Sequence, residues 1–378
     1  MKDLLPPREN LDLRGHEEAE KILLDGFHGG RLAHAWLISG PRGIGKGTLA
    51  YRFARYVLVH GGPGSAAEPE TGPGLFGDET PADGAGSLLR SLHGSLYVAP
   101  ENPVFRRIAA GGHSDFIGVE RTLNDKGKLR SEIVVDDVRA VGRFFSMTPG
   151  EGGWRVVVID SADEMNTSAA NAVLKVLEEP PARALLLLVS HNPGRLLATI
   201  RSRCRKLALQ PLPGETVEKL IAEALPDLDA GDASSLASLT DGSPGRALAL
   251  AAEGGLEIYR AMTGLLETLP RLDIPALHAF GARLGKAGAD EAFRTASNLL
   301  RWWLARLILS ASGAMAADGL TDDEKALMDR LGQAAGLDRW FEVWEKINRL
   351  LDKTEHANLD RKQVVLNVFL TLENAVSR

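Results

Sequence analysis

A glycine-rich segment near the N-terminus constrains the fold more than any other feature of the sequence. The segment LISGPRGIGKGTLA, residues 37–50, continues the apolar run HAWLISG and leads into the helical pattern GTLAYRFARYVLVH. A strand, a glycine loop and a helix in this order are the context that a phosphate-binding P-loop requires. We therefore expect an α/β domain built on a parallel sheet.

The glycine-rich segment departs from the P-loop pattern G-x-x-x-x-G-K-[ST] at one position. Gly40, Gly45 and Lys46 fit the pattern, but Gly47 stands where a hydroxyl should bind Mg²⁺, and Thr48 comes one residue late. One residue along a helix is about 100° around its axis, so Thr48 should point elsewhere. Two interpretations stay open: a phosphate cradle that uses Lys46, or a tight strand-to-helix turn without a ligand.

A second catalytic position is altered further along the chain. The run WRVVVIDSADEMN, residues 154–166, reads as a buried parallel strand that ends in Asp160, the expected Mg²⁺ partner. The next residue, where an ATPase of this type places a glutamate that orients water, is Ser161. Asp163 and Glu164 are near in sequence but should face differently. Both defects remove parts that phosphoryl transfer needs.

Composition limits the class of protein. A chain of 378 residues is long enough for two or three domains. A net charge of −6 argues against a protein that coats nucleic acid over its whole surface. The single cysteine allows no internal disulfide and no multi-cysteine zinc site. We find no signal peptide pattern and no apolar run of about 18 residues, so we expect a cytoplasmic protein.

The pattern of the chain predicts three parts. Residues 1–212 are expected to form the P-loop domain, with a flexible insertion at 61–87 that is rich in glycine, proline and acidic residues. Beta patterns then stop. Residues 213–258 read as a small helical lid, and residues 259–378 as an all-α C-terminal domain of amphipathic helices.

A cluster of basic residues lies close to the end of the predicted P-loop domain. The stretch ATIRSRCRKL is interpreted as a short helix and a basic strand end that carry Arg201, Arg203, Arg205 and Lys206. Composition alone favours a solvated basic edge for this cluster. A weaker alternative is a nucleic-acid-binding module, which would also use Arg106, Arg107, Lys126, Lys128 and Arg130.

Four segments together resemble the bacterial clamp-loader family of AAA+ proteins, most closely its delta-prime subunits. They are HAWLISGPRGIGKGTLAYRFAR, VVVIDSADEMNTSAANAVLKVLEEPP, ATIRSRCRKL with its Ser-Arg-Cys motif, and GSPGRAL at residues 242–248. They appear in the family's order from His34 to Leu248. The resemblance implies an AAA+ domain, a helical lid and a C-terminal collar that holds subunits in a ring.

The resemblance also implies roles for single residues. Arg203 would be an arginine finger that reaches the ATP site of a neighbouring subunit, and Arg246 would hold the sensor-2 position. Ser190 or Asn192 would lie near sensor 1. The implied nucleotide site comprises Gly40, Gly43, Gly45, Lys46, Thr48, Asp160, Asn192 and Arg246.

The resemblance implies partners and leaves the cofactor open. The partners would be the gamma/tau motor subunits and the delta subunit in a five-membered ring, with the sliding clamp and primed DNA met through the assembly. Delta-prime subunits typically do not hydrolyse ATP, in agreement with Gly47 and Ser161, while the retained Lys46 leaves weak ATP or ADP binding open. Family members often carry a four-cysteine zinc module after the P-loop helix, which this chain lacks the cysteines to build.

Two function classes therefore compete with a non-hydrolysing subunit. One is an active AAA+ motor of a clamp or helicase loader, which Gly47 and Ser161 disfavour. The other is the nucleic-acid-binding module without a role in ATP chemistry, which the acidic net charge disfavours.

Overall fold

The protein is described here by a computed structural model of residues 1–378. The structure describes all residues except 1–4, 63–94, 126, 315–320, 358 and 378, and for residues 355–357 it describes the backbone alone. The chain divides into two compact units, one over residues 3–212 and one that begins at Pro213. The sequence places its first domain boundary at the same position.

The first unit is built on a parallel sheet. Its strands are β1 (Ala35–Ser39), β2 (Phe116–Val119), β3 (Arg155–Ile159), β4 (Ala184–Ser190) and β5 (Arg205–Ala208), in the spatial order β2-β3-β4-β1-β5. Every neighbouring pair is parallel, so the carboxyl ends of all five strands meet at one edge. The α/β fold class and its parallel sheet are confirmed.

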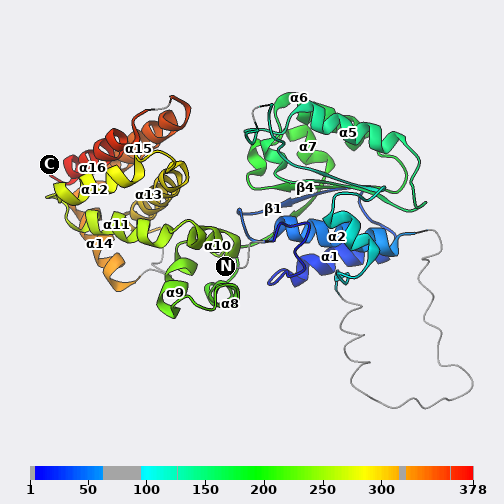
Figure 1. Ribbon diagram of the computed structural model, residues 1–378, viewed down its shortest axis with the longest axis horizontal. Helices are drawn as coiled ribbons and strands as arrows, with labels where there is room; N and C mark the ends of the chain where they lie inside the picture. The colour runs from blue at the N-terminus through cyan, green and yellow to red at the C-terminus, as the bar shows by residue number, and fades with distance from the viewer. Residues whose placement is uncertain (1–4, 63–94, 126, 315–320, 358, 378) are drawn as a thin grey trace, which may run out of the picture. The chain divides into compact units, whose positions relative to one another are not determined.

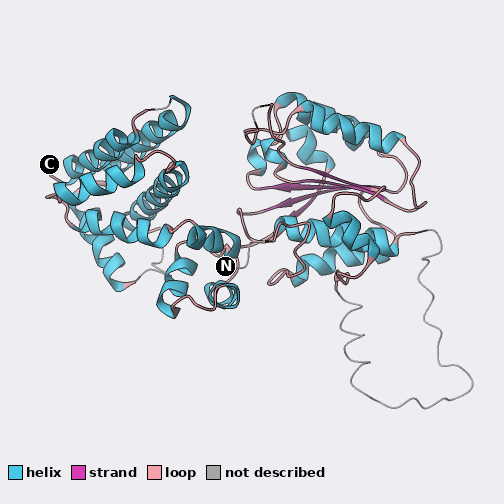
Figure 2. Ribbon diagram, viewed as in Figure 1, coloured by secondary structure: helices cyan, strands magenta, loops and turns pink. Residues whose placement is uncertain are grey.

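Helices cover both faces of this sheet (Figures 1 and 2). One face carries α1 (Glu17–His28), α2 (Lys46–His60) and α4 (Pro103–Ala109). The opposite face carries α5 (Val135–Ser146), α6 (Thr167–Glu178) and α7 (Ala198–Arg203). Helix α4 was not predicted from the sequence, although Asn102 caps its first turn and Pro103 begins it, a typical start for a helix.

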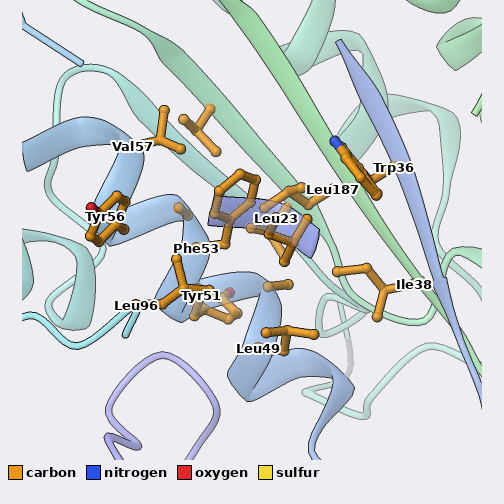
Figure 3. Close-up of a cluster of buried hydrophobic side chains, with 14 of the residues drawn as sticks. Leu23, Trp36, Ile38, Leu49, Tyr51, Phe53, Tyr56, Val57, Leu96 and Leu187 are labelled. Atoms are coloured by element: carbon orange, nitrogen blue, oxygen red, sulfur yellow. The ribbon is translucent and has the colours of Figure 1, made fainter. Parts of the chain in front are cut away.

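The side chains of each strand alternate between two hydrophobic clusters. Trp36 and Ile38 on β1 pack with Leu187 on β4 against α1 and α2, as Figure 3 shows. The residues that alternate with them, Ala35 and Leu37, face the helices of the other layer. Burial on both faces explains why β3 and β4 are apolar apart from Arg155 at the start of β3 and Ser190 at the end of β4. This double-sided core fixes the strand ends that carry the candidate site.

The second unit is entirely helical in its described residues. Its first helices are α8 (Gly214–Ala224), α9 (Ala230–Ser238) and α10 (Pro244–Ala252). They are followed by α11 (Gly255–Glu267), α12 (Ile274–Leu284), α13 (Asp290–Ala311), α14 (Asp322–Ala334), α15 (Leu337–Ala357) and α16 (Arg361–Val376). The division of this unit into a lid at 213–258 and a collar at 259–378 remains a prediction.

Two further expectations concern the insertion after α2 and the ability of the helices to cross a membrane. The predicted flexible insertion at 61–87 lies outside the described residues, apart from Gly61 and Gly62 at the end of α2. None of the helices that the structure describes has the length and apolar character needed to cross a membrane.

Candidate nucleotide site at the carboxyl edge of the sheet

The P-loop connects the end of β1 to the start of α2. Its glycines Gly40, Gly43 and Gly45 have φ values of +147°, +81° and +104°, which residues with a side chain rarely adopt. A Cβ on Gly40 would also lie 2.5 Å from the carbonyl oxygen of Leu209. The loop therefore brings backbone N–H groups to the N-terminus of a 15-residue helix, an arrangement that favours anions.

Lys46 is the first residue of α2 and is buried, with 2% of its surface exposed. Its ammonium group lies 2.5 Å from the carbonyl oxygen of Pro41, across the loop. Burial lowers the pKa of Lys46 to about 8, although the carboxylates of Asp160 and Asp163 act in the opposite direction. The ammonium group of Lys46 is therefore positively charged at neutral pH and mostly shielded from water, as a group that binds phosphate should be.

Gly47 and Asp160 face each other at the position where a working P-loop holds its metal. A Cβ built on Gly47 would lie 3.4 Å from Oδ2 of Asp160. Burial raises the pKa of Asp160, and the nearby Glu120 adds to this, while Lys46 lowers it. Thr48 has only 6% of its surface exposed and lies one residue further along the helix. The residues present fit a phosphate group, but Gly47 offers no oxygen to Mg²⁺.

Ser161 follows Asp160 in the left-handed conformation, with φ of +61°. Its hydroxyl lies 3.0 Å from Nε2 of His191, a residue that the sequence analysis missed. Burial and the charge of Lys46 lower the pKa of His191 to about 4, so the imidazole is neutral at pH 7. Ser161 and His191 thus form a neutral pair where an ATPase of this type places a carboxylate.

Asp163 organises the end of the neighbouring strand. Its carboxylate accepts hydrogen bonds from the backbone N–H groups of His191, at 2.9 Å, and Asn192, at 3.1 Å. Ser190 is fully buried at the end of β4, whereas Asn192 is exposed. Glu164 pairs instead with Arg121 at 2.9 Å and with Arg42 of the P-loop at 3.9 Å. The two acids therefore have different partners, and Asp163 is committed to the backbone after β4.

Arg203 lies on a separate element, at the last position of α7. One guanidinium nitrogen is 2.7 Å from Oε1 of Glu178 at the end of α6, and another donates to the carbonyl oxygen of Thr199 at 3.0 Å. The short helix predicted for this stretch is α7, which continues through Arg203, and the last strand, β5, begins at Arg205. The side chain of Arg203 is 36% exposed, so another molecule can reach it.

Arg246 lies in the helical unit, within the first turn of α10. Its backbone N–H donates to the side-chain oxygen of Ser243, the residue that caps this helix, at 3.3 Å. A sensor-2 role for Arg246 remains a prediction.

Comparison with known proteins shows which proteins this chain resembles. Residues 96–213 match the family described as DNA polymerase III, delta subunit. The chain is 38% identical to the DNA polymerase III subunit delta' of Pseudomonas aeruginosa over 229 residues, which cover 60% of this chain and 58% of that protein. The chain resembles the delta-prime subunits. The resemblance stated from the sequence motifs is therefore confirmed.

The chain is also similar to a second delta' subunit and to a tau subunit of DNA polymerase III. Identity to the delta' subunit of Escherichia coli is 34%, over 60% of this chain and 57% of that subunit. Identity to the tau subunit of Bacillus subtilis is 25%, over 65% of this chain and 37% of tau. A solved gamma-subunit-related protein of Thermotoga maritima aligns with 96% of this chain and 100% of its own, at 17% identity and a TM-score of 0.37. The matched region spans less than two thirds of the delta' relatives.

Proposed function

We propose that this chain is a delta-prime-like subunit of a bacterial DNA polymerase III clamp loader. In this role it assists the ATP-driven loading of the sliding clamp onto primed DNA during replication. Its partners are gamma/tau motor subunits and a delta subunit in a five-membered ring in the cytoplasm. The proposal rests on the similarity to delta-prime subunits together with one observation: both catalytic positions beside Lys46 and Asp160 are altered, to Gly47 and Ser161.

Two alterations at one site argue that the chain does not hydrolyse ATP. Gly47 faces Asp160 without an oxygen to complete a magnesium site. Ser161 is bonded to a neutral imidazole, and a serine hydroxyl is a far weaker base than the carboxylate it replaces. Phosphoryl transfer depends on the metal and on a positioned water, so the loss of both parts removes turnover.

The catalytic contribution of the chain is then Arg203, given to the ATP of a neighbouring motor subunit. A guanidinium group is planar, stays charged and suits phosphate oxygens. Its exposure and its position at the end of a short helix support this role. An arginine supplied in trans raises the rate of related phosphoryl transfers by about 10³–10⁵.

Reconstitution tests the proposal. The chain is mixed with gamma/tau, delta and clamp subunits, and complex formation and DNA-stimulated ATPase are measured. We expect a stable complex whose ATPase and clamp loading need this chain. Failure to join the complex would rule out the proposed role, and normal loading without the chain would do the same.

The retained Lys46 favours one alternative, an active motor subunit of a clamp or helicase loader. The purified chain decides between the two. Robust ATP turnover by the chain alone, lost in Lys46→Ala, would support the motor.

A further inference from the structure

The segment before the first helix lies directly on the P-loop. A Cβ built on Gly47 would be 3.1 Å from both Cβ and Cγ of Pro7, and one built on Gly45 would be 2.9 Å from Cδ1 of Leu13. Three residues beyond Leu13, the ring of His16 lies 2.6 Å from the carbonyl oxygen of Ile44. We call residues 5–13 the strap. It meets the loop at the position where a P-loop protein carries its metal-binding hydroxyl.

Two buried arginines on α2 hold the strap by its backbone. Arg55 is 1% exposed and donates to the carbonyl oxygen of Asn10 at 2.9 Å. Arg52 is 7% exposed, donates to the carbonyl oxygen of Leu11 and pairs with Glu20 at 2.8 Å. Buried guanidinium groups cost free energy unless they are hydrogen-bonded, so these contacts fix where the strap lies.

The strap is also shaped locally so that Pro7 projects from a turn. The carbonyl oxygen of Pro6 accepts hydrogen bonds from the N–H groups of Glu9, at 2.8 Å, and Asn10, at 3.0 Å. The ring of Pro7 is thereby part of a closed turn. This turn places an apolar ring beside Gly47 and Asp160, where a hydrated metal ion would need oxygen ligands and water.

We propose that the strap closes the metal side of the P-loop with Pro7, so that a nucleoside di- or triphosphate binds only when the strap moves away. The position of Pro7 also explains why residue 47 is a glycine. A serine or threonine there would restore the motif but would place its Cβ 3.1 Å from two carbons of Pro7, closer than ordinary van der Waals contact. The missing hydroxyl is therefore matched to the strap, and metal-dependent binding is blocked twice at one position.

This inference goes beyond the proposed function and does not depend on Arg203 or on any partner. It concerns nucleotide binding by the chain alone, whereas the proposed function is tested by assembly and by the ATPase of motor subunits. The strap proposal can therefore fail while the proposed function holds, and the proposed function can fail while the strap proposal holds.

A double-mutant cycle on the full-length chain tests the strap. Binding of a fluorescent ADP and of ATP is measured with and without Mg²⁺ for wild type, Pro7→Gly, Gly47→Ser and the double variant. Pro7→Gly should bind nucleotide at least tenfold more tightly than wild type. Gly47→Ser alone should gain nothing, and the double variant should gain further affinity that requires Mg²⁺. Pro6→Ala is the matched control and should bind like wild type, because it removes a proline ring from the same turn but keeps the carbonyl oxygen that closes the turn and leaves Pro7 in place.

Two results would overturn the strap. One is wild-type affinity in Pro7→Gly, and the other is Mg²⁺-dependent binding in Gly47→Ser without any change at Pro7. Hydrogen exchange of the wild-type chain gives a test that does not depend on how the variants fold. Saturating nucleotide at millimolar concentration should speed exchange of the backbone amides of residues 8–13. Unchanged exchange under these conditions would show that the strap does not move for nucleotide.

Discussion

Arg203 and Glu178 form an ion pair that joins the ends of two helices, with 2.7 Å between a guanidinium nitrogen and Oε1. Both side chains are well exposed, at 36% and 50%. Exposed pairs of this kind contribute about 0–1 kcal/mol to stability, so the pair is weak enough to open. Glu178 therefore holds the proposed finger in place without committing it to its own chain.

We predict that Arg203→Ala leaves the chain folded and able to assemble, but lowers DNA-stimulated ATPase and clamp loading well below wild type. The free energy of unfolding should fall by no more than about 1 kcal/mol, because only an exposed ion pair is lost. Arg203→Lys should rescue little, since an ammonium group cannot reproduce the planar fork. Urea unfolding and the ATPase of the reconstituted complex measure both effects.

Arg201→Ala is the matched control for this prediction, because Arg201 lies on the same helix. Arg205 is less suitable, since its guanidinium lies 4.7 Å from the centre of the Trp36 ring and contributes to packing on β5. Normal clamp loading by Arg203→Ala complexes would refute the finger and leave the chain a purely structural subunit.

We predict that the isolated chain hydrolyses ATP at no more than background. The reason is the glycine that faces Asp160 and the serine that is bonded to His191. Steady-state phosphate release measures the rate, with Lys46→Ala as the control for contaminating ATPase. Turnover that is robust in wild type and absent in Lys46→Ala would contradict the prediction.

Local patterns in the sequence were enough to predict much of the fold and the separate parts of the site. The apolar run that became β3, and the glycines between β1 and α2, are each read within about ten residues. The contacts between these parts were not readable in the same way. Ser161 meets His191 only because β3 and β4 are parallel neighbours in a fixed register.

The strap shows the same limit more sharply. Pro7 and Gly47 are forty positions apart, and no periodic pattern connects them. Gly47 could be recognised as a missing hydroxyl, but only the fold shows the proline ring that stands beside it. The Arg203–Glu178 pair likewise depends on how α6 packs on α7.

We predict that phosphate and nucleotide affinity falls as the pH rises past about 8. Burial lowers the pKa of Lys46 from 10.5 to about 8, so the folded protein loses this proton well before the unfolded chain does. Each pH unit above the pKa should weaken binding by up to tenfold, until the pKa that Lys46 takes in the complex is reached. Titration calorimetry between pH 6.5 and 9.5 measures this trend.

The lowered pKa of Lys46 makes the stability of the fold change with pH in the direction opposite to nucleotide affinity. A lowered lysine pKa means that the unfolded state binds more protons between about pH 8 and 10.5, so this group makes stability rise with pH there. Lys46→Met should remove both trends. A nucleotide affinity that stays level from pH 7 to 9.5 in wild type would contradict a buried ammonium at the phosphate position.

Asp163→Asn should destabilise the protein by about 1–3 kcal/mol at pH 7, because an amide can accept only with one oxygen and its NH₂ group would face a backbone donor. The carboxylate now accepts from the N–H groups of both His191 and Asn192. Burial acts to raise the pKa of Asp163, but backbone hydrogen bonds, led by the one from the N–H group of His191, lower it overall, so the pKa lies below its ordinary value of 3.8. Urea unfolding of both proteins measures the difference.

The pH dependence separates this role from a general packing defect. A lowered carboxylate pKa contributes stability that is present above the unfolded value of 3.8 and is lost as the pH falls through the folded value. The gap between wild type and Asp163→Asn should therefore be constant from pH 8 to 5 and shrink at lower pH. Asp136→Asn on α5 is the control, because that side chain is 79% exposed and should cost no more than about 1 kcal/mol. If the two substitutions cost the same at pH 7, Asp163 does not hold the end of β4 as described.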